Sequence, residues 1–328
     1  MKICLIDTDS TIPNLALMKL STYHKNKGDE VTLLKAKLPY YPNRKKKYFN
    51  VPDGYDTIYC SVVFDNNKDF IGGDNIIFGG SGYSLDINLP DNIENLLPDY
   101  SMYPDNDISY GFLSRGCIRN CKFCIVPRKE GGIKQVSTIN DIVRHKKVKF
   151  LDNNFLALPN HKQLLKELIA TKVKCQFCQG LDIRLVDEEN SKLLSKLNYI
   201  NGEYIFAFDD ISLSSLIDKK LKLLDWRKPF RFKFFVYCHP DTGLKDICER
   251  IEWLRSRRIL PYVMRDISCW ESEYSHFYMD ISAYCNQPNF FKRTSFIEFL
   301  HIRYKNKDRI EYSNKLYEDN KPKGVNYD

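Results

Sequence analysis

Three cysteines lie close together in the segment SRGCIRNCKFCIVPRKEGG (114–132), at Cys117, Cys121 and Cys124. Three thiolates on one short loop can hold a metal centre without ligands from distant parts of the chain. Zinc usually takes a fourth Cys or His, typically from a second closely spaced pair. A cubane 4Fe–4S cluster normally takes four thiolates, so three leave one iron without a protein ligand. The loop therefore predicts an iron–sulfur cluster with one position open for chemistry.

The other cysteines do not predict a second metal site. Disulfide frameworks belong to small secreted domains, and this chain of 328 residues has 11 cysteines without a signal-peptide pattern at its start. Cys175 and Cys178 form a second close pair, but they lie in an expected strand, where residues three apart point to opposite faces. We expect the remaining six cysteines to be buried as small apolar side chains.

A regular alternation of strands and helices positions the cysteine loop. Apolar runs predict strands at 108–113, 148–153, 173–182, 204–210, 231–239 and 261–267, with amphipathic helical segments between them. Right-handed crossovers would curl such a parallel sheet toward a barrel, but six units are too few to close an eight-stranded one. We expect a partial (β/α)6 TIM-like barrel. In such sheets the chemistry lies beyond the carboxyl ends of the strands, and the cysteine loop follows the first strand directly.

A smaller sheet is expected before this array. Apolar strands at 2–7, 30–34, 56–64 and 75–80, with a helix at 13–28, predict an α/β start of the Rossmann-like, parallel-sheet type. Its glycines do not form a G-x-G-x-x-G pattern followed by a helix, so no dinucleotide site is expected. A Pro-, Asn- and Asp-rich linker follows at 89–107. The expected divisions are an N-terminal domain (1–100), the barrel (101–285) and a basic C-terminal extension (286–328).

Composition limits the possible partners without choosing among them. Hydrophobic residues make up 43% of the chain and the formal net charge is +8, which is a globular, mildly basic composition that favours anionic partners. Basic and aromatic residues alternate at 38–49 and 290–309, as they do on nucleic-acid surfaces, although solvated loops and helices give the same pattern. No apolar run approaches the roughly 18 residues of a membrane span. We expect a cytoplasmic protein without a membrane partner. Its substrate could be a nucleic acid, a nucleotide, a peptide or a small metabolite.

The words GCIRNCKFCIVPRKEGG, placed after the first strand of a β/α array, resemble the radical S-adenosylmethionine (SAM) superfamily. The resemblance is to the branches in which Gly precedes the first Cys and an aromatic residue precedes the third. It implies that Cys117, Cys121 and Cys124 hold a 4Fe–4S cluster and that Phe123 lies near the adenine of SAM. It also implies that one electron, from an external donor of the flavodoxin or ferredoxin type, cleaves SAM to a 5′-deoxyadenosyl radical that abstracts hydrogen from substrate.

The resemblance covers roughly residues 108 to 267 and implies further SAM-binding side chains at the ends of the second, third and fourth strands. They are Asp152, Asn153, Asn154, Gln179, Asp182, Arg184 and Asp209. Asp152-Asn153-Asn154 stands where the family usually has a Gly-Gly-Glu-like motif that binds the methionyl amine. Arg184 is the natural partner for the methionyl carboxylate, because a guanidinium binds a carboxylate through two parallel hydrogen bonds.

Two other functions are also compatible with the cysteine loop. The chain could be an iron–sulfur binding or regulatory protein without radical catalysis, or a methylthiotransferase-like enzyme that modifies RNA. Members of the latter family carry three further N-terminal cysteines, whereas only Cys4 and Cys60 precede the loop here. The segment DTDSTIPNLALMKLSTYHKNKGDEV (7–31) resembles the Rossmann-like domain of cobalamin-dependent members of the superfamily. The Asp-x-His-x-x-Gly cobalamin motif is absent, so cobalamin is not expected.

Overall fold

The computed structural model describes residues 1–39, 45–224 and 228–323. The chain forms two compact units. The first comprises Met1–Phe112, Arg119–Gly132 and Val136–Val148, and the second comprises Leu113–Ile118, Ile133–Gln135 and Lys149–Asp328. Both contain parallel sheets and helices, so the predicted α/β class is confirmed.

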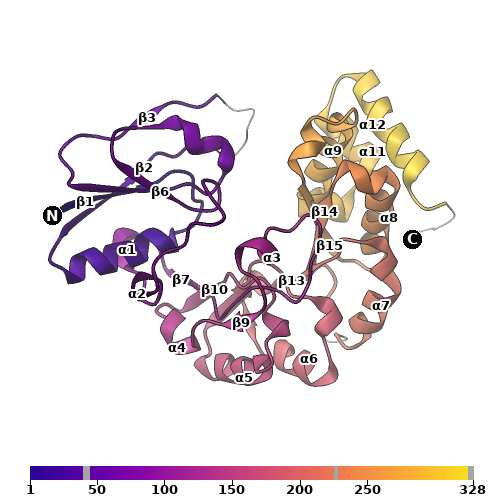
Figure 1. The fold of residues 1–328 in the computed structure, drawn as a ribbon. Coiled ribbons are helices and arrows are strands. Elements are labelled where there is room, and N and C mark those ends of the chain that lie inside the picture. The colour runs from indigo at the N-terminus through magenta and orange to yellow at the C-terminus, as the bar shows by residue number, and fades with distance from the viewer. Residues whose placement is uncertain (40–44, 225–227, 324–328) are drawn as a thin grey trace. The chain divides into compact units, whose positions relative to one another are not determined.

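The sheet of the first unit is parallel and four-stranded, with the order β2-β1-β4-β6. Its strands are β1 (Lys2–Asp7), β2 (Glu30–Lys35), β4 (Thr57–Ser61) and β6 (Ile76–Gly79). Helix α1 (Leu15–Asn26) runs along one face of this sheet (Figure 1) and begins at Asn14, whose side chain accepts from the amide of Leu17. The central strand β1 is apolar from Ile3 to Ile6: Ile3 and Leu5 pack toward α1, while Cys4 and Ile6 enter a second core. The parallel sheet predicted for the start of the chain is thus present, with α1 covering one face.

The first unit also contains several short elements. They are β3 (Phe49–Asn50), β5 (Ile71–Gly72), α2 (Asp91–Glu94), β7 (Ile108–Gly111), α3 (Val126–Lys129) and α4 (Ile139–Ile142). The expected linker at 89–107 packs against α1: Asp99 accepts hydrogen bonds from Ser21 Oγ (2.7 Å) and Lys25 Nζ (2.7 Å). This segment is therefore part of the first unit's structure.

Two groups of parallel strands form the second unit. One group follows the order β12-β11-β10 and comprises β12 (Asn198–Tyr199), β11 (Lys174–Phe177) and the end of β10 (Lys147–Phe150), of which Lys149 and Phe150 belong to this unit. The other follows the order β13-β14-β15 and comprises β13 (Tyr204–Ala207), β14 (Phe232–Cys238) and β15 (Leu260–Arg265). A single parallel bridge between Leu181 and Phe206 joins the groups. A short antiparallel pair, β8 (Ser114–Arg115) and β9 (Lys134–Gln135), also belongs to this unit.

Helices cover the strands of the second unit. They are α5 (His161–Thr171), α6 (Glu188–Ser195), α7 (Ser214–Lys222), α8 (Gly243–Ser256), α9 (Ser275–Cys285), α10 (Pro288–Arg293), α11 (Phe296–Arg303) and α12 (Lys307–Asn320). Helix α8 packs against β14 and β15, and α9, α11 and α12 pack together (Figure 1). The region expected as a basic extension is therefore helical, and its Phe296, Phe299 and Tyr317 are buried. Asp280 of α9 binds α12 through Ser313 Oγ (2.7 Å).

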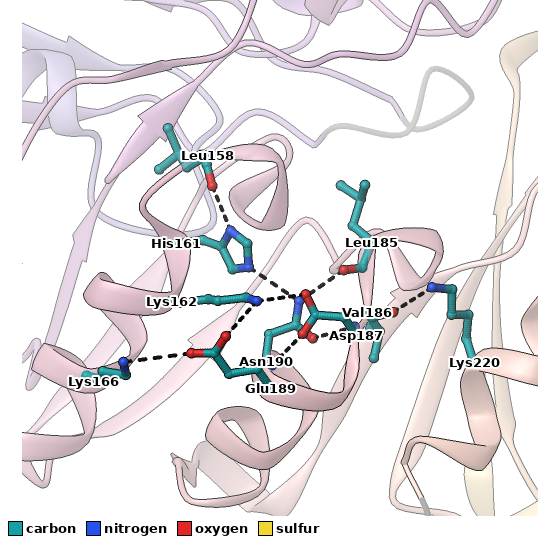
Figure 2. A network of polar contacts seen from close by, with 10 residues as sticks. All are labelled: Leu158, His161, Lys162, Lys166, Leu185, Val186, Asp187, Glu189, Asn190 and Lys220. Atoms are coloured by element: carbon teal, nitrogen blue, oxygen red, sulfur yellow. Dashed lines mark hydrogen bonds and ion pairs between the residues drawn. The ribbon is translucent and has the colours of Figure 1, made fainter.

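A polar network joins α5 and α6 (Figure 2). Lys162 Nζ lies 3.0 Å from Asp187 and 2.8 Å from Glu189. Asn190 Oδ1 accepts from the amide of Asp187 (2.8 Å), and its Nδ2 donates to the carbonyl of Leu185 (3.0 Å). The network therefore fixes the segment between β11 and α6, which carries three of the expected site residues, Gln179, Asp182 and Arg184.

Candidate cysteine-loop site

The end of β10 holds the start of the cysteine loop. Asp152 is buried, and its Oδ1 accepts from the amide and the hydroxyl of Ser114, both at 2.6 Å, while Oδ2 accepts from the amide of Leu113 at 3.2 Å. Asn153 Oδ1 accepts from the amide of Gly116 at 3.0 Å. Gly116 has a φ of 86°, a left-handed conformation that favours glycine, which explains the Gly before the first cysteine. Side chains from one strand end thus fix the backbone that leads into Cys117.

Burial dominates the electrostatics of Asp152. It raises the pKa of this carboxyl from 3.8 to about 6, although the hydrogen bonds from Ser114 and Leu113 act in the opposite direction. The carboxylate oxygens are engaged by the loop backbone. In this structure Asp152 therefore positions the loop.

Asn154 connects the cysteine loop to the next strand end. Its Nδ2 donates to Cys117 Sγ at 3.3 Å and to Asp182 Oδ2 at 3.4 Å. Its Oδ1 is buried and has no hydrogen-bond partner among the residues that the structure describes. Leaving a buried acceptor unpaired costs roughly 1–3 kcal/mol. Such an atom calls for an explanation, and a hydrogen-bond donor from a bound ligand would supply one.

Acidic and basic side chains continue the site beyond β11 and β13. Asp182 accepts from Arg184 Nε (2.6 Å) and Nη2 (3.0 Å), a two-point ion pair that fixes the guanidinium. Burial raises the pKa of Asp209, while the charges of Arg250 and Arg184 lower it. Asp209 also accepts from the amide of Tyr237 at 3.2 Å. The structure therefore brings Asn154, Asp182 and Arg184 into one hydrogen-bonded set, with Asp209 within their electrostatic reach.

Besides Asp152 and Asn153, which bind the loop backbone, two predicted cofactor-binding residues lie outside this set. Gln179 is exposed in the turn after β11. Phe123 is 43% exposed in the turn closed by the hydrogen bond from the amide of Cys124 to the carbonyl of Cys121 (3.0 Å). Both positions leave the side chain open to solvent in the chain alone.

The cysteines divide as the sequence indicated. Cys117, Cys121 and Cys124 are partly exposed, whereas the six expected to be small buried residues are all buried, which confirms that prediction. Cys117 belongs to the second unit, and the other two loop cysteines belong to the first. Across residues 1–39, 45–224 and 228–323, no three His, Cys, Asp or Glu side chains form a group that could hold a metal ion. The three-cysteine ligand set stays a prediction from the sequence.

A polar group that the predicted site does not include lies at the ends of β14 and β15. Tyr237 Oη donates to Asp266 Oδ2 at 2.6 Å, and His239 Nε2 lies 3.8 Å from Asp266 Oδ1. The burial of β14 alternates along the strand, so Phe235 and Tyr237 lie on its less buried face. The ring centroids of Phe235 and of Tyr262 in β15 lie 5.7 Å apart. Tyr262 is 41% exposed. The alternating sequence FKFFVYC could have indicated this open aromatic face.

Comparison with known proteins adds no assignment: no protein-family model matches the chain, and no curated protein matches it in sequence. In the described parts of the chain, none of the helices has both the length and the apolar character needed to cross a membrane. What the protein does must therefore be inferred from its own residues.

Proposed function

We propose that the protein is a radical SAM enzyme. Cys117, Cys121 and Cys124 would hold a 4Fe–4S cluster, which when bound supplies the electron for reductive cleavage of SAM and so starts hydrogen abstraction from a substrate. The strands β7, β10, β11, β13, β14 and β15, which overlap the predicted ranges, would form the partial (β/α)6 barrel around this site.

The observation that carries the proposal is Asn154. The side-chain amide of Asn154 is buried and donates to the sulfur of Cys117. Its oxygen has no hydrogen-bond partner among the described residues. An N–H donated to a cluster thiolate raises the reduction potential of the cluster, because it withdraws charge from the sulfur. The unpaired Oδ1 is an acceptor for the methionyl ammonium of SAM. The residues present therefore suit both groups.

The neighbouring side chains can take the rest of SAM. Arg184 would pair with the methionyl carboxylate, and Asp182 holds the guanidinium in a fixed orientation. Asp209 would accept from a ribose hydroxyl. Gln179, which is exposed, would face the ribose or the carboxylate of SAM, and the resemblance implies that Phe123 lies near the adenine. Phe235, Tyr237 and Tyr262 offer an aromatic face for the substrate and for excluding water.

The test is reductive cleavage of SAM by the full chain. The protein is reconstituted anaerobically with iron and sulfide, reduced with dithionite or a flavodoxin, and assayed for 5′-deoxyadenosine by mass spectrometry. We expect a cluster with the absorption and electron paramagnetic resonance of a 4Fe–4S centre, and SAM-dependent formation of 5′-deoxyadenosine. A protein that assembles the cluster but forms no 5′-deoxyadenosine would refute the enzyme and leave the iron–sulfur regulatory function.

Variants separate cluster binding from SAM binding. Cys117→Ala should lose the cluster. Asn154→Ala should keep most of the cluster and bind SAM at least tenfold more weakly, measured as the SAM-induced change in the resonance spectrum. Asn198→Ala, an exposed asparagine in β12, is the matched control and should match wild type.

A further inference from the structure

A pocket of about 210 Å³ opens in the first unit, and none of the residues of the proposed SAM site is among those that line it. Its walls are the segment Asp7 to Thr11, which follows β1, and the segment Lys35 to Pro39, which includes the end of β2. Both strands are parallel, so these segments meet at the carboxyl edge of the sheet. Ligands of open α/β sheets bind outside this edge.

The inner wall of the pocket is held rigidly by its neighbours. Asp9 accepts from the amides of Val63 (2.9 Å) and Phe64 (3.1 Å) and from Asn67 Nδ2 (2.9 Å). Asn14 Nδ2 donates to Ser10 Oγ at 3.0 Å, which leaves the hydroxyl hydrogen of Ser10 available for donation. The loop after β1 is therefore shaped before any ligand arrives.

The carboxylates of the pocket are already engaged. Both oxygens of Asp9 accept hydrogen bonds as described above. Asp7 Oδ1 accepts from the amide of Ser10 (3.1 Å), and Oδ2 accepts from Tyr103 Oη (3.2 Å). Burial raises the pKa of Asp7, while the hydrogen bonds from Ser10 and Tyr103 and the charge of Lys35 lower it. The acids thus act as structural acceptors turned into the protein.

The lysines of the pocket remain available. Within the described part of the chain, neither Lys35 nor Lys37 forms an ion pair, and both are exposed. Lys35 Nζ lies 4.5 Å from the centroid of the Tyr103 ring, which directs it along the sheet edge. Thr11 adds an exposed hydroxyl. Two cations and two hydroxyl donors face a space that Leu38 and Pro39 make partly apolar.

We propose that this pocket binds a small organic phosphate. Lys35, Lys37 and the hydroxyls of Ser10 and Thr11 would contact the phosphate, because several donors around one anion suit its three oxygens. The pocket is larger than a phosphate group alone requires. The organic part of the ligand, such as a sugar, would lie against Leu38 and Pro39. The site is independent of the cysteine loop and of the function proposed for it.

Calorimetric titration of the full chain tests this site with ribose 5-phosphate, AMP, inorganic phosphate, ribose and magnesium chloride. We expect ribose 5-phosphate or AMP to bind at least tenfold more tightly than inorganic phosphate, and ribose not to bind. The variant with Lys35→Gln and Lys37→Gln should weaken this binding at least tenfold. Thr11→Ala should weaken it less. Lys2→Gln, at the opposite end of β1, is the matched control and should bind like wild type.

Three results would overturn the proposal. One is the absence of binding by either organic phosphate at millimolar concentration. Another is unchanged affinity in the double lysine variant, with circular dichroism showing that it is folded. The third is saturable magnesium binding that persists in that variant and is lost in Asp7→Asn, which would make the pocket a cation site. None of these results bears on SAM cleavage, so the two proposals fail separately.

Discussion

Asn154 and Asn190 offer a comparison that tests how the site is built. Both are buried asparagines of the second unit, at the ends of neighbouring β/α segments. The side chain of Asn190 is paired on both sides, through the amide of Asp187 and the carbonyl of Leu185. Asn154 makes two long hydrogen bonds and, among the described residues, leaves Oδ1 unpaired. Truncation of each asparagine to alanine should therefore change stability and SAM binding differently in the two variants.

The magnitudes follow from these contacts. Asn154→Ala loses two bonds of 3.3 and 3.4 Å, worth about 0.5 kcal/mol each, and removes an unpaired acceptor that costs roughly 1–3 kcal/mol. A small cavity costs about 1 kcal/mol. The free energy of unfolding should stay within about 1 kcal/mol of wild type. Asn190→Ala leaves two backbone groups unpaired at about 1 kcal/mol each and adds a similar cavity, so it should lose about 3 kcal/mol.

Urea unfolding of the metal-free, reduced protein, followed by circular dichroism, measures both changes. The SAM-induced change in the resonance spectrum then measures how tightly each variant binds SAM. We expect Asn154→Ala to be nearly neutral for stability and poor in SAM binding, and Asn190→Ala to be destabilised and, at a temperature where it is folded, normal in SAM binding. If Asn154→Ala costs as much stability as Asn190→Ala, the oxygen of Asn154 is satisfied within the protein and its assignment to a ligand is wrong.

Three further predictions concern the loop and its anchor. The pKa of Asp152 is raised from 3.8 to about 6 in the folded state. Its contribution to stability is therefore largest below pH 4 and falls by about 3 kcal/mol as pH rises through 6. The unfolding midpoint of wild type should decline relative to that of Asp152→Asn across this window, and parallel curves would refute the burial argument. Asp152→Ala frees the amides of Leu113 and Ser114, so trypsin should cleave the cysteine loop at least about tenfold faster, measured by mass spectrometry; equal rates would show that another contact holds the loop. Gly116→Ala places a side chain on a residue with a φ of 86° and should lower the free energy of unfolding by about 1–2 kcal/mol. Gly132→Ala is the control: a Cβ there would meet no atom within 4 Å, so this variant should lose less than about 0.5 kcal/mol. Equal losses in the two variants would contradict the assignment of strain to Gly116.

The positions of the strands could be predicted because apolar runs alternate regularly with amphipathic segments. Their ends could not. The run 173–182 was expected to be one strand, but β11 ends at Phe177. Gly180 then turns with a φ of 81°, and Asp182 caps a short 3-10 turn through the amide of Arg184. Turn chemistry in the letters GLD therefore overrode the apolar pattern. The turn places Asp182 and Arg184 beside Asn154.

The C-terminal segment shows a second limit of sequence patterns. Aromatic and basic residues alternate at 290–309, which is compatible with a nucleic-acid surface. In the structure Phe291, Phe296 and Phe299 are buried, while Lys292 and Arg293 are exposed. The alternation follows from helices that place one face in a core. These buried rings are therefore not available to stack on bases.

The tripeptide Asp152-Asn153-Asn154 shows why the sequence could indicate where the candidate site lies but not which contacts each side chain makes. Its residues bind successive parts of the facing loop: Asp152 binds Leu113 and Ser114, Asn153 binds Gly116, and Asn154 binds the sulfur of Cys117. A Gly-Gly-Glu-like motif would offer a side chain only at the third position. That third position is here the asparagine whose second polar atom, within the described chain, has no partner. The first two side chains therefore position the loop, and under the proposed function the third would bind the ligand.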